Sequence, residues 1–190
     1  MENLSRRTRM VVAVLAAWAV ANTGCGSPTS PSTSATDTCP AVAGRGSMCA
    51  QIDGVAWVAA SPPPNTQPLG CFYNSALLYC QGYDSNVSGQ ARQIAFALPF
   101  PTVGTQVFGG DGNVGNLPQA GLAIVTPSQR MLWGSEQPGG SGTVTITSLT
   151  TASVAGTFSF VLPSRCCGAT GTRTITSGTF DITAFDLTFN

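Results

Sequence analysis

An alternation of apolar and hydroxyl-bearing side chains dominates the C-terminal third of this chain of 190 residues. Residues 142–149 place Val144 and Ile146 on one face and threonines on the other, and residues 153–162 repeat the pattern with valine and phenylalanine. Successive side chains of a strand point to opposite faces, so this pattern predicts β-strands with one buried and one exposed face. No sustained period of 3.6 residues follows residue 38, which predicts little or no helix.

Turn signals separate these strands from one another. Asp53-Gly54 predicts a hairpin turn within residues 48–59, with Trp57 as a core anchor. Ser177-Gly178 predicts a second two-residue turn, which would complete a four-stranded antiparallel meander at the end of the chain. The apolar phase then changes, which predicts a bulge near Ala184 and Phe185.

Shorter apolar runs predict the remaining strands. They lie at residues 75–80, 90–98, 104–108, 120–126 and 130–133. Eight to ten short strands joined by Gly/Pro turns predict an all-β fold, either an antiparallel β-sandwich or an open β-barrel.

The N-terminus has the organisation of an export signal. Arginines at positions 6, 7 and 9 precede the 12 apolar residues 10–21. A bilayer-spanning helix needs about 20 apolar residues, so this segment predicts a cleavable signal peptide over residues 1–24.

Cys25 follows Thr23-Gly24 directly after the apolar segment, and this arrangement resembles the lipobox of bacterial lipoproteins. The resemblance implies that Cys25 is lipidated and becomes the first mature residue. Asn22 stands where that motif usually has an aliphatic residue, and Ala19-Val20-Ala21 offers an alternative cleavage site for ordinary secretion.

Residues 25–38 are rich in Ser, Thr and Pro and favour an extended tether of about 40 Å. We therefore expect a single β domain over residues 39–190, attached to the cell envelope and specifically to the outer membrane.

The remaining cysteines predict a disulfide-stabilised domain. They are Cys39, Cys49, Cys71, Cys80, Cys166 and Cys167. An even number in an oxidising compartment predicts up to three disulfides, and Cys71 with Cys80 would close a local loop. Adjacent cysteines in an extended chain point to opposite sides, so Cys166 and Cys167 are expected to bond to different partners. The absence of paired C-x-x-C motifs and of histidine argues against structural zinc.

The charge pattern excludes one class of partner. Charged residues make up only 8% of the chain, whereas soluble proteins average roughly 25%. Three of the eight basic residues lie in the signal, which leaves five arginines against seven acidic residues. Nucleic-acid binding needs a clustered basic surface, so we expect no nucleic-acid partner.

The chemistry available to this chain is limited. Without histidine or lysine it cannot form Ser-His-Asp, Cys-His or Ser-Lys nucleophile systems, so we expect no enzyme. A carboxylate pair such as Asp181 and Asp186 keeps open the alternative of a hydrolase acting on extracellular or envelope polysaccharide. Solvated charges on an exposed face are the favoured interpretation of both, and Asp53 is interpreted as a turn residue.

Two segments offer possible binding sites. Asp111, Asn113 and Asn116 resemble the start of a calcium loop, but the position of the closing glutamate holds Leu122, so a plain loop is favoured and no cofactor is expected. A cluster of aromatic residues is a candidate surface for a glycan or an envelope protein, with core packing as the alternative. It comprises Phe72, Tyr73, Tyr79 and Tyr83.

Three motifs support a family resemblance. They are A-x-I-D-G-x-x-W at residues 50–57, G-T-F-S-F at 156–160 and T-I-T-x-G-T-F-D-I-T at 174–183. With these motifs the chain resembles a group of uncharacterised bacterial lipoproteins, which implies the fold and the location but no catalytic residues. We expect a non-enzymatic, membrane-anchored β domain for binding or surface interaction. A secreted, non-lipidated carbohydrate-binding module is the alternative.

Overall fold

The computed structural model describes residues 39–60, 68–85, 89–109, 118–183 and 185. These residues form twelve strands and no helix. Accordingly, no helix within this part of the chain is long and apolar enough to cross a membrane.

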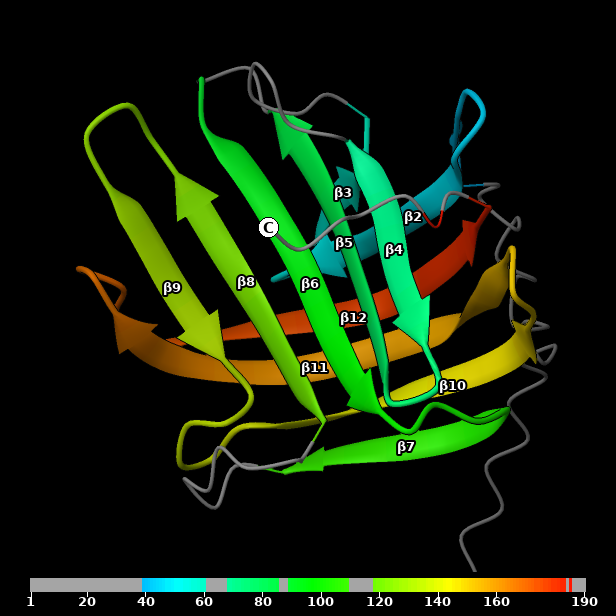
Figure 1. The fold of residues 1–190 in the computed structure, drawn as a ribbon. Coiled ribbons are helices and arrows are strands. Elements are labelled where there is room, and N and C mark those ends of the chain that lie inside the picture. Colours follow the sequence, from blue (N-terminus) through cyan, green and yellow to red (C-terminus); the bar gives the residue numbers. More distant parts are fainter. Residues whose placement is uncertain (1–38, 61–67, 86–88, 110–117, 184, 186–190) are drawn as a thin grey trace, which may run out of the picture. The chain divides into compact units, whose positions relative to one another are not determined.

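The strands belong to two halves of one antiparallel sheet, here called sheet A and sheet B (Figure 1). Sheet A contains β1 (Ala41–Val42), β2 (Gly46–Ile52), β3 (Val55–Val58), β7 (Gly104–Gly109), β10 (Ser141–Leu149), β11 (Val154–Cys166) and β12 (Thr172–Ile182). Sheet B contains β4 (Leu69–Asn74), β5 (Leu77–Ser85), β6 (Ala91–Pro99), β8 (Gln119–Val125) and β9 (Arg130–Gly134). Figure 1 shows the strands of sheet B crossing those of sheet A at a steep angle.

Strand β11 joins the two sheets on one side. It pairs with β10 and β12 along most of its length, and its C-terminal end pairs with β9, with Ser164 opposite Trp133. On the other side, Arg45 Nη1 donates to the Leu69 carbonyl at 3.2 Å and Ala60 N to the Tyr83 carbonyl at 3.0 Å. The result is a nearly closed, barrel-like sheet, which confirms the predicted all-β fold.

The core lies between the two sheets and is rich in aromatic residues. Phe96 from sheet B packs against Phe158, Phe160 and Phe180 from sheet A, with ring centroids 5.3–6.4 Å apart. Trp57 is 1% exposed and is therefore the predicted core anchor. These rings are buried because each occupies the inward position of the alternating pattern.

The two predicted hairpin turns have different outcomes. Asp53-Gly54 forms the predicted turn, with Ile52 opposite Val55 and positive φ at both turn residues. The turn predicted at Ser177-Gly178 is wrong, because β12 continues through it as one strand. The register of β12 shifts there against both neighbours, so these two residues form a bulge.

The physical reason for this bulge is a change in apolar phase. Ile175 and Phe180 have opposite parity in the sequence, yet both are buried, and one extra residue returns the second to the core. The meander therefore has three strands, β10, β11 and β12. The bulge predicted near Ala184 and Phe185 involves a residue outside the described part of the chain, and strand β4 was not among the predicted segments.

Three disulfides connect the six cysteines. Cys39 bonds to Cys49, and Cys71 bonds to Cys80 directly across the β4–β5 hairpin, which confirms the predicted local loop. Cys166 bonds to Cys167, so the expectation of two different partners is wrong. The chain is not extended there, since Cys167 and Gly168 both have positive φ and Ala169 N donates to the Cys166 carbonyl at 3.2 Å.

Candidate functional site

The four predicted aromatic residues do not form one surface. Phe72 lies opposite Tyr79 across β4 and β5, and alternation places both on the outer face of sheet B together with Tyr83. Tyr73 points the other way, packs against the core and contacts the Phe185 ring at a centroid distance of 5.8 Å. The sequence-based cluster is therefore divided between a face and the core.

The other predicted sites are placed as follows. Asp181 is exposed on the outer face of sheet A, opposite Ser47 on β2 and Ala155 on β11. The remaining candidates lie outside the described residues. These are Cys25, Asp111, Asn113, Asn116 and Asp186.

The outer face of sheet B is hollow because a row of very small residues crosses it. Strand register places Ala95 of β6 beside Gly121 of β8, and Gly121 beside Gly134 of β9. At one end of this row stands Gln81 of β5. Ala95 and Gly121 carry nothing larger than a methyl group, so the backbone itself forms the floor at these two positions.

Larger side chains border this floor. Two adjoining cavities of about 170 and 140 Å³ lie over it, and both are lined by Tyr79 and Arg165. Gln93, Arg130 and Leu132 line the first cavity. We call these two cavities together the trough.

A chain of hydrogen bonds fixes one side of the trough. Tyr79 Oη donates to Gln81 Oε1 at 3.0 Å, and Gln93 Nε2 donates to the same oxygen at 2.9 Å. Arg130 Nη2 donates to Gln93 Oε1 at 3.2 Å. Burial raises the pKa of Tyr79, the charge of Tyr83 raises it further and Arg130 opposes the rise. The Tyr79 phenol is thus a neutral donor at pH 7.

A buried acid fixes the opposite side. The Glu136 side chain is 5% exposed. Its Oε1 forms an ion pair with Arg165 Nε at 3.1 Å and accepts a hydrogen bond from Gln137 Nε2 at 3.2 Å. It folds back over Gly134 and occupies the space that a side chain there would need. Ser135 holds this turn in place, because its Oγ accepts from Ala120 N at 2.8 Å.

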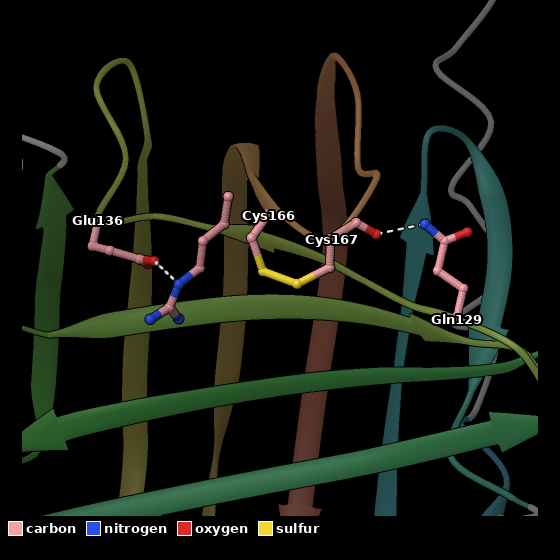
Figure 2. The surroundings of a disulfide bond; sticks show 5 residues. Gln129, Glu136, Cys166 and Cys167 are labelled. Carbon is pink, nitrogen blue, oxygen red and sulfur yellow. Dashed lines mark hydrogen bonds and ion pairs between the residues drawn. A yellow bond between two sulfur atoms is a disulfide. The ribbon is translucent and has the colours of Figure 1, made fainter.

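The disulfide between adjacent cysteines follows Arg165 directly. Figure 2 shows it with Glu136 on one side and Gln129 on the other. Gln129 Nε2 donates to the Cys167 carbonyl at 2.7 Å, and Cys166 pairs with Leu132 of β9. The end of β11 is therefore held by a covalent ring, a side-chain hydrogen bond and strand pairing, and it positions the Arg165 guanidinium at the trough.

Sequence reasoning missed most of the residues that form the trough. They are Gln93, Arg130, Glu136 and Arg165, together with Gln81, which holds the side chains of Tyr79 and Gln93. One local signal was present, since Tyr79, Gln81 and Tyr83 share one parity of a single strand. The rest depends on register between strands that are far apart in the sequence.

The chemistry of the trough suits binding. Glycoside hydrolysis usually needs two carboxyl groups about 5–10 Å apart, and Glu136 is the one carboxylate among the described lining residues. Among the residues that the structure describes, no three His, Cys, Asp or Glu side chains are grouped to hold a metal ion. Tyrosine, glutamine and arginine at a small concave site are groups that orient a polar ligand.

Comparison with known protein families, curated proteins and solved structures found no match to this chain.

Proposed function

We propose that this chain is an exported, non-enzymatic binding protein, anchored to the membrane through Cys25, whose β domain holds a saccharide ligand in the trough on sheet B. The observation that carries the proposal is the pair of small residues Ala95 and Gly121, which lie between two fixed polar walls. Side chains normally cover the outer face of a sheet, and a hollow forms there only where the residues along a row are small.

The composition of the walls favours a sugar. Sugar rings combine an apolar face with a rim of hydroxyl groups. The backbone and methyl groups of the floor can pack against such a face, and the Tyr79 ring offers an aromatic contact. Gln93 and Arg130 line the first cavity, where hydroxyl groups at the rim of a sugar would need hydrogen-bond partners.

A substitution of the floor tests the trough. Ala95→Leu fills the hollow and is expected to lower saccharide affinity by about tenfold or more. Ala155→Leu is the matched control, because it makes the same change on the outer face of sheet A and should leave affinity unchanged. The screen uses an array of saccharides with the full chain purified in detergent. Binding that survives Ala95→Leu would place the site elsewhere, and binding to no saccharide at all would overturn the proposal.

Intact mass spectrometry of the chain from its native membrane fraction tests the anchor. A mature protein that begins at Cys25 and carries acyl chains supports the lipoprotein proposal. An unmodified protein that begins at Asn22 would replace it with a secreted, carbohydrate-binding module.

A further inference from the structure

The hydrogen bonds inside the trough leave it rich in donors. Gln81 Oε1 accepts two hydrogen bonds and Gln93 Oε1 accepts one from Arg130. Glu136 Oε1 accepts one from Gln137 and forms an ion pair with Arg165. Each of these three oxygens is thus engaged by a neighbouring residue, whereas the guanidinium groups of Arg130 and Arg165 each carry five N–H groups.

The accessible charges at the trough also favour a ligand that accepts hydrogen bonds. Arg130 is exposed, and the side chain of Arg165 is 53% exposed although its Nε pairs with Glu136. The Glu136 carboxylate is almost fully covered, so the accessible charge at the trough is positive. Residues 25–190 carry more acidic than basic residues, so the sign of the charge at the trough differs from that of this part of the chain as a whole.

The shape limits the size of the ligand. Drug-sized sites usually measure roughly 300–1,000 Å³, and the two cavities of about 170 and 140 Å³ together reach only the lower end of that range. Arg165 lines both cavities and Arg130 lines the first one. One or two sugar rings lying on the floor would therefore present their edges to a guanidinium.

We propose that the trough recognises a carboxylate-bearing sugar, that is, a uronic acid residue of an acidic glycan, through Arg130 and Arg165. A guanidinium binds a carboxylate with two parallel hydrogen bonds, a geometry that an uncharged sugar cannot reproduce. This inference rests on the proposed function and adds the class of sugar.

Calorimetry on the full chain in detergent tests the inference with trigalacturonic acid as the probe. Its methyl ester keeps the rings and removes the charge, and is expected to bind about tenfold more weakly. Arg130→Gln and Arg165→Gln are each expected to weaken binding of the acid by a similar factor, with little effect on the ester. Arg165→Gln also leaves Glu136 without this partner, so Arg130→Gln provides the test that does not disturb the buried acid.

A matched control removes the same charge elsewhere. Arg45 lies in the turn between β1 and β2, outside the trough lining, and Arg45→Gln should leave the affinity for the acid unchanged. Equal affinity for the acid and its ester would overturn the uronate inference and leave the proposed saccharide function intact. Inorganic phosphate that binds as tightly as the acid would overturn it as well, because the sugar would then contribute nothing. Failure of every saccharide to bind would overturn both proposals.

Discussion

Sheets A and B share one core, but their outer faces differ in the sizes of their side chains. Four threonines lie side by side in one row of sheet A, and Cys49 of β2 continues the row. The threonines are Thr105, Thr145, Thr157 and Thr179. Thr105 and Thr145 hydrogen bond to one another at 2.9 Å. The equivalent row on sheet B falls from a glutamine to alanine and glycine. Side chains of equal size leave a flat face whose hydroxyl groups can hydrogen bond to one another. A change from large to small side chains along a row leaves a hollow with polar walls.

The largest change is expected in the core that both faces share. Phe160 packs against Phe96, Phe108 and Phe158 and is 2% exposed. Phe160→Ala should lower the free energy of unfolding by about 3–5 kcal/mol, through lost apolar burial and the cavity that remains. Chemical denaturation measures this change. A loss below about 1 kcal/mol would mean that the two sheets do not depend on a common core.

Two of the disulfides are expected to differ in how much they stabilise the fold. Replacing Cys71 and Cys80 with alanine together removes a buried cross-link between β4 and β5 and should lower the free energy of unfolding by about 2–4 kcal/mol. Replacing Cys166 and Cys167 together should change it by less than about 0.5 kcal/mol, because the pair is exposed and closes no loop of intervening residues.

For ligand binding we expect the opposite order, with the larger effect from the Cys166–Cys167 disulfide. The end of β11 carries Arg165 into the trough, so opening the Cys166–Cys167 ring frees the arginine to leave its place beside Glu136. The double alanine variant is expected to bind trigalacturonic acid about fivefold more weakly, which calorimetry measures. Unchanged affinity would show that strand pairing alone positions Arg165.

Alternation in the sequence predicted most strands because burial on one face fixes the pattern locally. Positive φ occurs in tight turns and in bulges, and Ser177 has it here, so Ser177-Gly178 was ambiguous from its residue types. The deciding observation is the phase of Ile175 against Phe180, which favours a bulge within one strand. The pairing of Cys166 with Cys167 likewise depends on a local turn that an extended-chain assumption excludes.

The trough is less accessible to sequence reasoning for a different reason. Gln81 and Gly134 are more than fifty residues apart, and they share a row only through the registers of three successive strand pairs. A shift of one residue in any pair would move the small side chains to the other face. Alanine and glycine have a weak propensity for β-strands, and the sequence near each of them does not show that they meet in a hollow.

The Asp53 contacts connect the two sheets and give a smaller effect. Arg173 Nη1 donates to Asp53 Oδ2 at 2.7 Å, and the same guanidinium lies 5.0 Å from the ring centroid of Trp133 in sheet B. Burial acts to raise the pKa of Asp53, but hydrogen bonds from Thr174 and Arg173 and the arginine charge outweigh it and lower the pKa.

A lowered folded pKa means that this stabilisation is present above the unfolded value of about 3.9 and is lost as the pH falls through the folded value. Asp53→Asn should therefore cost about 1 kcal/mol at pH 7 and have less effect at acid pH. Denaturation of both proteins at several pH values measures the difference. A deficit of the Asp53→Asn variant that stays constant down to the acid limit would contradict the charge assignment.

The smallest effect is expected on the threonine face, and it completes the comparison. Thr145→Val keeps the shape of the side chain and removes its hydrogen bond with Thr105. Because the position is partly exposed on a β-strand, the free energy of unfolding should change by less than about 0.5 kcal/mol. Affinity for trigalacturonic acid should equal that of the unmodified chain, since the core separates this face from the trough. A loss of affinity would show that the threonine row contributes to the ligand site. The division into a flat threonine face on sheet A and a binding face on sheet B would then be wrong.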